Sequence, residues 1–260
     1  MVRLKTPQEI EDIREGGAIL SRVLTELVSM VRPGMTTGEL DALAEKRMRE
    51  AGGEPSFKGY VVDPDIRPFP STVCLSINDE VVHAPSDVSR ELTDGDILKL
   101  DIGLRYKGLC TDMAVTVPVG TVPDETLKLI AVTKESMFVG IGKAREGGWI
   151  SDIGKAVDKV VRRNGYSTVK DLTGHGVGHQ VHEEPHIPNY FDPGAHPVKI
   201  VRGMVLAIEP MVNMGEEDVR MKRDGWTVVT DDESPSAHFE VTIAITDKGM
   251  EILTPVPLNA

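Results

Sequence analysis

The chain has 260 residues, of which 40% are hydrophobic and 27% charged, a composition typical of a soluble globular protein. Its formal net charge of −12 argues against a protein that binds nucleic acid by neutralising phosphates. The two cysteines, Cys74 and Cys110, are too few for a disulfide scaffold and suit a reducing cytosol. Residues 1–17 lack the apolar segment of a signal peptide, and no stretch approaches the roughly 18 apolar residues of a membrane-spanning helix. We therefore expect a cytoplasmic protein without a membrane or nucleic-acid partner.

The N-terminal part of the chain predicts two helices. Thr6, Pro7 and Glu9 form the signature of a helix start, with a capping residue, a proline at the first helical position and a reciprocal glutamate. Apolar residues then recur at helical spacing up to residues 32–34, where an Arg-Pro-Gly sequence ends the run. A second helix is expected over residues 36–52, because a glycine pair follows its apolar stripe.

From Ser71 onward the apolar period changes to two and β-branched residues become frequent, which predicts strands. The expected strands are residues 71–78, 80–84, 96–106 and 110–117 and, after two further helices over 124–143 and 151–164, residues 199–212, 226–230 and 236–246. The order helix, helix, strands thus occurs twice. It predicts an α+β fold of two similar halves, about 1–120 and 121–260, each with a sheet beneath two helices. No linker separates the halves, so a single domain over residues 1–260 is expected.

Two aspartates are predicted to lie close together on one hairpin. Lys107 and Gly108 read as a two-residue turn, and the register that follows places Asp112 opposite Gly103. Asp101 is then a diagonal neighbour of Asp112 on the same face, about 7–8 Å away at the backbone. Isolated aspartates in strands usually cap turns or face water, but these two stand among apolar residues. Like charges so placed repel unless a cation or a proton intervenes.

Histidines are concentrated in one part of the chain. Five of the seven fall between His175 and His196, most of them in the glycine-containing segment 174–186. Histidine is a common metal ligand and proton carrier. A run of histidines is also typical of a solvated loop, so this segment alone leaves both interpretations open.

Two glutamates stand in apolar strands, Glu209 in VLAIEPMV and Glu240 in HFEVTIAIT. A buried glutamate is costly unless it is paired or bound to a metal. One such residue could be a structural ion pair, whereas two, together with the aspartates and the histidines, favour a single metal site. An oxygen-rich site with one or two imidazoles suits manganese, iron, cobalt or zinc in a binuclear arrangement. Two adjacent metals polarise a carbonyl and activate hydroxide, so hydrolysis is the expected chemistry.

The ordered ligand series resembles the dimetal set of the pita-bread metallopeptidases: Asp101, Asp112, His175, Glu209 and Glu240. The strings SINDEVVH, GDILKLDIG, TDMAVTV, GHGVGHQVHEEP and GMVLAIEPMV are similar to those of type I methionine aminopeptidases, and the resemblance covers nearly the whole chain. It implies a pita-bread fold, with two pseudo-symmetric α+β halves around a central antiparallel sheet. It also implies a monomer that removes the N-terminal methionine from nascent proteins and peptides when the second residue is small, associates transiently with the ribosome and uses two divalent ions (cobalt, manganese, iron or zinc).

The resemblance assigns a role to each residue of the series. Asp101 chelates one metal, while His175 and Glu209 hold the other. Asp112 and Glu240 bridge the two. Glu209 also handles protons around the metal-bridging hydroxide that attacks the scissile carbonyl.

Residues outside the ligand series are expected to contact the substrate. By the same resemblance, His83 and His182 are catalytic residues that contact the substrate and the developing tetrahedral intermediate, as imidazoles placed to recognise an oxyanion or a peptide N–H. The pocket for the methionine side chain would involve Tyr60, Phe69, Cys74 and Trp226. Without the resemblance, His83 and Trp226 would read as residues that pack on a sheet.

Three features depart from the family pattern, and all concern the methionine pocket. The segment between Tyr60 and Pro70 is longer than usual for the family, which bears on the positions of Tyr60 and Phe69. Phe57 and Val181 stand where bacterial relatives often have cysteine and phenylalanine. We therefore expect the pocket to differ in shape, whereas the metal ligands are intact.

Three relatives of the same fold are alternatives. A prolidase or aminopeptidase P carries a substantial N-terminal domain, whereas only about one hundred residues precede Asp101. A type II methionine aminopeptidase carries a helical insertion for which the spacing from Glu209 to Glu240 leaves no room. A non-catalytic homologue of the proliferation-associated type would have lost metal ligands, and none is lost here.

Overall fold

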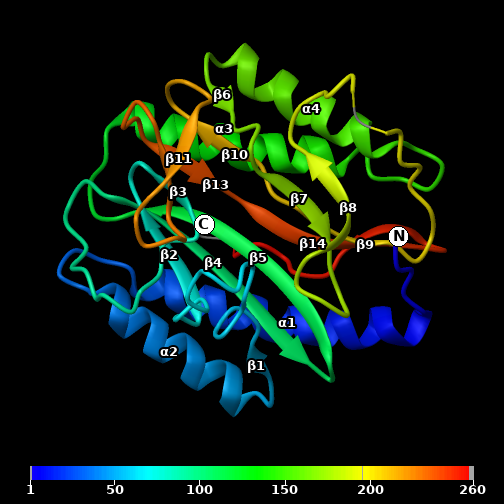
Figure 1. Ribbon diagram of the computed structural model, residues 1–260, viewed down its shortest axis with the longest axis horizontal. Helices are drawn as coiled ribbons and strands as arrows, with labels where there is room; N and C mark the ends of the chain where they lie inside the picture. Colours follow the sequence, from blue (N-terminus) through cyan, green and yellow to red (C-terminus); the bar gives the residue numbers. More distant parts are fainter. Residues whose placement is uncertain (1, 195, 258–260) are drawn as a thin grey trace.

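The computed structural model describes residues 2–194 and 196–257, so residues 1, 195 and 258–260 of the expected domain lie outside the described part. Four helices lie within it: α1 Pro7–Met30, α2 Thr37–Glu50, α3 Asp124–Ile141 and α4 Ile150–Arg163. The strands are β1 Glu54–Pro55, β2 Val73–Ile77, β3 Glu80–Val82, β4 Ile97–Tyr106, β5 Leu109–Pro118, β6 Ser167–Thr168, β7 Thr173–Gly176, β8 Glu183–Pro188, β9 Val205–Ile208, β10 Met211–Asn213, β11 Val219–Met221, β12 Val228–Thr230, β13 Ser236–His238, β14 Glu240–Thr246 and β15 Gly249–Ile252. In Figure 1, α1 and α2 lie along one side of the strands and α3 and α4 along the other.

The helices begin close to the residues that the sequence predicted. At the start of α1, the Thr6 hydroxyl accepts from the Glu9 N–H and the Glu9 carboxylate accepts from the Thr6 N–H, so the capping box is complete. An equivalent box with Thr36 precedes α2. The fourth helix begins at Ile150, one residue before the predicted start.

A nine-stranded antiparallel sheet forms the centre of the described molecule, in the order β1-β4-β5-β14-β9-β7-β8, with β2 added to β4 and β15 to β14. Two smaller sheets, β13-β10-β6 and β11-β12-β3, adjoin it. Helix α1 packs on β4 and β5, whereas α3 contacts β13 and β10 and α4 contacts β8 and β6. A single cluster of buried apolar side chains draws on all four helices and the central sheet. The two helix pairs therefore cover different parts of one layer of strands.

The β4–β5 hairpin has the predicted register. Gly103 pairs with Asp112, and the turn residues Lys107 and Gly108 have φ of 49° and 82°. Positive φ at both central residues is what a type I′ turn requires, and this turn matches the twist of the flanking strands. Local turn chemistry thus fixes the positions of the two aspartates.

Three predicted strands are interrupted or shorter than expected. The stretch 199–212 pairs as a strand only from Val205 and breaks between β9 and β10 at Glu209-Pro210, because proline has no N–H to continue the ladder. The stretch 236–246 breaks at Phe239, between β13 and β14, and the stretch 226–230 pairs only from Val228. These breaks correct the sequence-based prediction and, as described next, they fall at the two glutamates.

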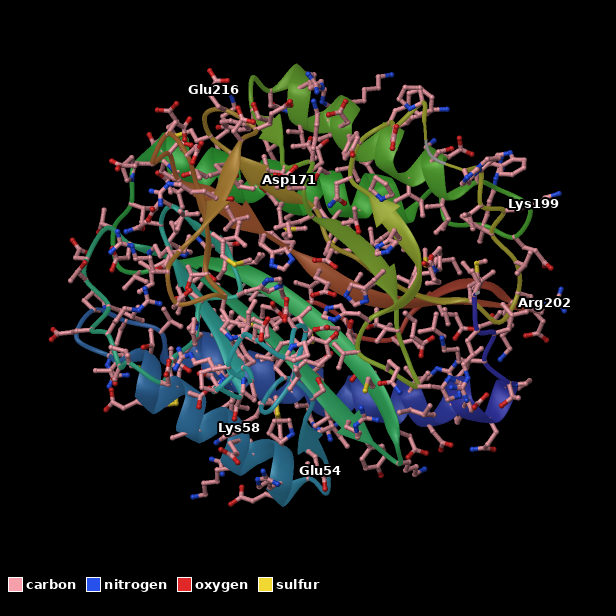
Figure 2. All side chains as sticks on the ribbon, viewed as in Figure 1. Glu54, Lys58, Asp171, Lys199, Arg202 and Glu216 are labelled. Atoms are coloured by element: carbon pink, nitrogen blue, oxygen red, sulfur yellow. The ribbon has the colours of Figure 1, made fainter. Side chains whose placement is uncertain are left out.

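No helix in the described part of the chain has both the length and the apolar character needed to cross a membrane. Charged side chains project from the periphery of the molecule. Figure 2 shows this for Lys58 and Glu54 beside α2 and for Lys199, Arg202 and Glu216 on other parts of the rim.

Candidate active site

One cavity of about 460 Å³ brings together all eleven residues that the sequence predicted for the site. Its polar end is formed by the five acidic and imidazole side chains of the ligand series, with two more histidines beside them: Asp101, Asp112, His175, Glu209, Glu240, His83 and His182. Its apolar end includes the four residues expected to hold a methionine side chain: Tyr60, Phe69, Cys74 and Trp226. Ile66 and Met221, to which the sequence analysis gave no role in the site, also line it. Phe57, which the sequence placed at the methionine pocket, lines it as expected, whereas Val181, placed there with it, is buried and does not line the cavity.

The register of the central sheet places the carboxylates on one face. Ala114 of β5 pairs on one side with Asp101 of β4 and on the other with Glu240 of β14. Paired residues in an antiparallel sheet have their side chains on the same face. Asp112 is two residues from Ala114 and so shares that face. Because alanine has only a methyl group, the space between the carboxylates stays open.

Glu209 joins this row at the interruption of the strands. Ile208 pairs with Val241 and Met211 pairs with His238, and in both pairs the residue numbers add to 449. The same register places Glu209 opposite Glu240, where the ladder is broken and the Phe239 N–H reaches Pro210 O at 3.4 Å. Two glutamates thus face each other where the backbone ladder leaves room for their side chains.

His175 reaches the row from β7. It pairs with Ala207, two residues before Glu209, and its Nε2 lies 3.2 Å from Glu209 Oε1 and 3.9 Å from Glu240 Oε1. Its Nδ1 lies 2.9 Å from Gly176 O, to which a neutral ring would donate. That hydrogen bond leaves the Nε2 lone pair directed at the carboxylates, as a metal-binding histidine requires.

The charges of this cluster are not balanced by the protein. Burial, followed by the neighbouring carboxylates, raises the pKa of Asp112 and of Glu240 well above the usual range. Burial also raises the pKa of Asp101 to about 6. Burial would raise the pKa of Glu209 as well, but the adjacent imidazoles of His175 and His238 outweigh it and lower this pKa to about 2. Asp112 and Glu240 would therefore be ionised at neutral pH only with cations beside them.

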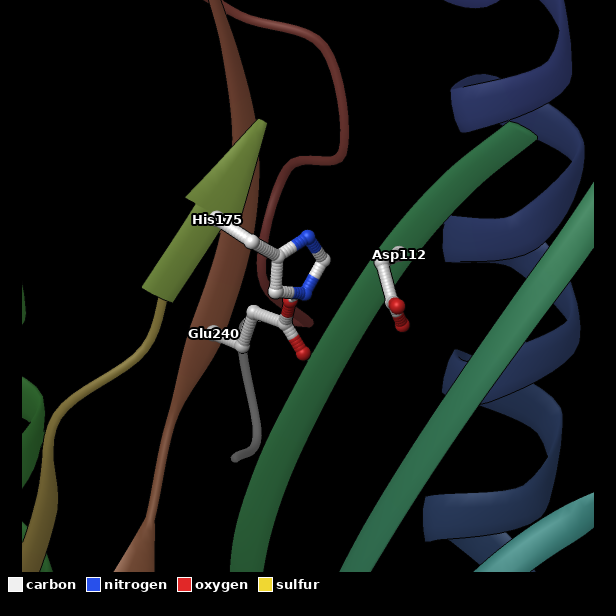
Figure 3. A group of neighbouring side chains, drawn as sticks. All are labelled: Asp112, His175 and Glu240. Atoms are coloured by element: carbon white, nitrogen blue, oxygen red, sulfur yellow. Dashed lines mark ion pairs between the residues drawn. The ribbon is translucent and has the colours of Figure 1, made fainter. Parts of the chain in front are cut away.

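Buried polar atoms without partners support the same conclusion. Oδ1 of Asp101, Oδ1 of Asp112 and Oε1 of Glu240 are buried and have no hydrogen-bond partner among the described residues. Asp112, His175 and Glu240 offer ligand atoms that lie within 4.8 Å of one another, and Figure 3 shows Asp112 on β5 facing the adjacent side chains of His175 and Glu240. Glu240 also belongs to a second such group with Glu209 and His238. The residues therefore fit divalent cations, with Glu240 common to both groups.

Two further histidines lie beside this cluster. Desolvation lowers the pKa of His83 to about 4. His182 is partly exposed, yet desolvation and the neighbouring His175, whose ring centroid is 4.4 Å away, lower its pKa to about 3. His182 Nδ1 is 2.8 Å from the Tyr60 hydroxyl. Both imidazoles are thus neutral at physiological pH and available as hydrogen-bonding groups.

Aromatic side chains build the apolar end of the cavity. Phe69 packs edge-on against Phe57 and Trp226, with ring centroids 6.5 and 5.1 Å apart. Backbone hydrogen bonds of 2.8 Å from Phe69 N–H to Tyr60 O and from Gly59 N–H to Phe69 O close the base of the segment 61–68. The long segment is therefore an excursion from this base, and Tyr60 and Phe69 both reach the cavity in spite of it.

One residue in contact with the cluster was missed by the sequence analysis. His238 is 1% exposed, and its Nε2 lies 3.6 Å from Glu209 Oε2. The signal was its position two residues before Glu240, which places both side chains on one face of an extended strand.

Buried carboxylates and an imidazole at the end of an apolar pocket define a metallohydrolase of α+β architecture. A model of metallopeptidase family M24 matches residues 11–247, and the chain belongs to this family. Relatives include the methionine aminopeptidase of Clostridium perfringens, 46% identical over 254 residues (98% of this chain and 99% of the relative), and methionine aminopeptidase 1 of Bacillus subtilis, 44% identical over 256 residues (98% and 100%).

Solved structures are similar over the same length. The methionine aminopeptidase of Thermotoga maritima has a TM-score of 0.92 and 39% identity, covering 98% of this chain and 99% of that one. A prolidase from Pyrococcus furiosus has a TM-score of 0.74 at 22% identity and shares the fold alone; this chain covers 65% of it. The pita-bread fold predicted from the sequence is confirmed.

Proposed function

We propose that this protein is a metal-dependent aminopeptidase that removes the N-terminal methionine from peptides and nascent proteins whose second residue is small. The observation that carries the proposal is the single cavity in which an aromatic pocket adjoins a cluster of buried carboxylates. The relatives described above, 44–46% identical and named methionine aminopeptidases, support it.

The ligand series would hold two divalent ions. Asp101 would hold one ion and His175 and Glu209 the other, while Asp112 and Glu240 would serve both. Such ions act as Lewis acids and generate a nucleophile from water at neutral pH. Glu209, whose pKa is about 2, stays ionised and accepts protons near the scissile bond only transiently.

His83 and His182 recognise the peptide. When the Tyr60 hydroxyl donates to Nδ1 of His182, the ring proton resides on Nε2, which then donates to the oxyanion that develops at the scissile carbonyl. His83, directly after β3, supplies a second neutral imidazole. Because both rings are neutral at physiological pH, they add hydrogen bonds without repelling the metal ions.

The aromatic end of the cavity accepts the methionine side chain. A thioether packs well against aromatic rings, and Phe57, Phe69 and Trp226 line this end of the cavity. Burial and nearby aspartates raise the pKa of Cys74 well above its usual range, so it remains a neutral thiol and adds apolar surface. The Trp226 Nε1–H donates to Arg67 O at 2.9 Å, which holds the indole in place.

The same proposal covers the cofactor and the partners. Cobalt, manganese, iron or zinc would fill the two metal positions, since all suit carboxylate and imidazole ligands. A nascent polypeptide would present the N-terminal methionine, with transient association at the ribosome. The protein would act as a monomer in the cytoplasm.

A peptidase assay tests the function. Protein freed of metal with a chelator is reconstituted with each metal separately and offered Met-Ala-Ser and, in parallel, Xaa-Pro dipeptides. Metal-dependent release of methionine supports the proposal. Cleavage confined to the proline substrates would assign the protein to the prolidase branch of the fold, and no cleavage of either would favour a binding protein.

A further inference from the structure

His238 is a buried imidazole that none of the predicted roles uses. Neither of its ring nitrogens has a hydrogen-bond partner among the described residues. Its Nε2 lies 3.6 Å from Oε2 of Glu209, slightly beyond hydrogen-bond distance. A buried imidazole without a partner costs free energy, so a role for this contact is expected.

The backbone holds the imidazole where it is. The N–H of His238 donates to Thr116 Oγ1 at 2.8 Å, and the same hydroxyl donates to His238 O at 2.7 Å. His238 also pairs with Met211 on β10. Since the backbone is fixed on both sides and the residue is 1% exposed, the ring cannot turn away to solvent.

The two oxygens of Glu209 face two different imidazoles. Oε1 lies 3.2 Å from His175 Nε2, on the side of the ligand cluster, whereas Oε2 lies on the side of His238. The Glu209 backbone is held separately, because Asn189 Nδ2 donates to Glu209 O at 2.9 Å. Apart from the contact of Oε1 with His175, the rotation of the carboxylate therefore depends on what Oε2 contacts.

The carboxylate oxygen of Glu209 that faces Nε2 of His238 selects the ring nitrogen that carries the proton. A proton on Nε2 gives an N–H directed at a carboxylate oxygen, whereas a proton on Nδ1 would set two lone pairs against each other. We propose that His238 is a positioning residue whose Nε2–H hydrogen bonds Oε2 of Glu209 and directs Oε1 at the metal ion shared with His175. The inference rests on the dimetal centre of the proposed function.

Three substitutions separate this role from packing. In His238→Gln the amide nitrogen occupies about the position of Nε2, in His238→Asn the amide reaches only the position of Nδ1, and His238→Leu removes the donor. Metal-free proteins are titrated calorimetrically with Mn²⁺, and their thermal unfolding is recorded without metal. His196→Gln, at an exposed histidine, is the control.

We expect Mn²⁺ to bind roughly 10- to 100-fold more weakly to His238→Leu and His238→Asn, the usual cost of losing a partner of a metal ligand. His238→Gln should stay within about threefold of the unchanged protein, as should His196→Gln. Pulsed electron paramagnetic resonance of bound Mn²⁺ should show the same directly coordinated imidazole nitrogen in His238→Gln as in the unchanged protein.

Several results would overturn the inference. Equal Mn²⁺ affinity of His238→Leu and the unchanged protein would mean that the contact is immaterial. A His238→Gln variant that binds as weakly as His238→Leu, or that loses a nitrogen coupling, would make His238 a packing residue or a direct ligand. If the unchanged protein binds no Mn²⁺, the proposed metal centre fails as well, which is distinguishable from failure of the His238 role alone.

Discussion

Asp101 and Glu240 are 139 positions apart in the sequence and share a backbone partner, because Ala114 pairs with both. The three residues form one row across β4, β5 and β14, and their side chains lie on one face of the sheet. Ala114 is fully buried in the middle of that row. Its small side chain is therefore a condition for any cation to lie between the two carboxylates.

Replacing Ala114 by leucine should abolish metal binding while the protein still folds. The larger side chain would occupy the space between Asp101 and Glu240, at an overpacking cost of about 1–3 kcal/mol. Calorimetric titration with Mn²⁺ and thermal unfolding measure the two effects. Ala114→Gly keeps the space open and should retain metal binding; equal metal affinity of the leucine variant would show that no ion lies in this row.

Loss of a bridging carboxylate should remove metal and activity together. Asp112→Ala and Glu240→Ala each leave two cations with less negative charge at short range, so both variants should be inactive and bind metal weakly. Metal content and turnover after reconstitution are the measurements. Near-normal turnover with two tightly bound metals in either variant would contradict the assignment.

Asp112→Asn should raise the free energy of unfolding of the metal-free protein and lower that of the metal-bound protein. Burial and adjacent carboxylates raise the pKa of Asp112 in the folded protein, so the ionised side chain lowers stability once the pH exceeds the unfolded pKa of about 3.9. At neutral pH, metal-free Asp112→Asn should thus be more stable than the unchanged protein. With saturating metal the order should reverse, and urea unfolding under both conditions checks it.

His182 should affect turnover without affecting metal content. His182→Ala removes one preorganised donor at the developing oxyanion, and a fall in kcat of roughly 10²–10³ is expected. Tyr60→Phe removes only the hydroxyl that contacts Nδ1 and should lower kcat less. Metal analysis accompanies both assays; if metal is lost with activity, His182 is a ligand.

Substrate choice should be sharper for the second residue than for the first. The aromatic pocket discriminates by a few methylenes, worth about 1–3 kcal/mol, so norleucine or leucine at the N-terminus should be cleaved slowly. Large second residues are excluded sterically. Met-Ala, Met-Gly and Met-Ser peptides should therefore be cleaved and Met-Lys and Met-Phe peptides be nearly inert in a kcat/KM comparison. Preferred release of a residue other than methionine would contradict the pocket assignment.

The capping box of α1 should contribute to stability only above acidic pH. A hydrogen bond from the Thr6 N–H lowers the pKa of Glu9 to about 2, with a further hydrogen bond from His179. A depressed acid pKa stabilises the fold above the unfolded pKa of about 4.3, and this contribution is lost as pH falls towards 2. Glu9→Gln should cost no more than about 1 kcal/mol at pH 7 because the side chain is partly exposed. The difference should vanish near pH 2, with exposed Glu11→Gln as the control in urea unfolding.

Local signals in the sequence determined where two helices begin and how the β4–β5 hairpin pairs. Capping residues set the starts of α1 and α2, since a side chain within three positions satisfies the free backbone N–H groups. The Lys107-Gly108 turn set the register that brings Asp101 and Asp112 to one face. The resemblance to a family then named eleven side chains that the structure brings to one cavity, and their individual roles remain predictions.

Only the tertiary structure decided how distant strands meet. The break at Phe239 and the shared pairing of Ala114 follow from long-range pairing. A strand's own alternation specifies which face is buried but not which strand lies beside it. The contact between His238 and Glu209 could not be predicted from the sequence for the same reason. Packing across the whole core selects which strands pair. His238 reads as an ordinary strand position in the sequence and becomes a neighbour of the site only when β9–β10 and β13–β14 come together.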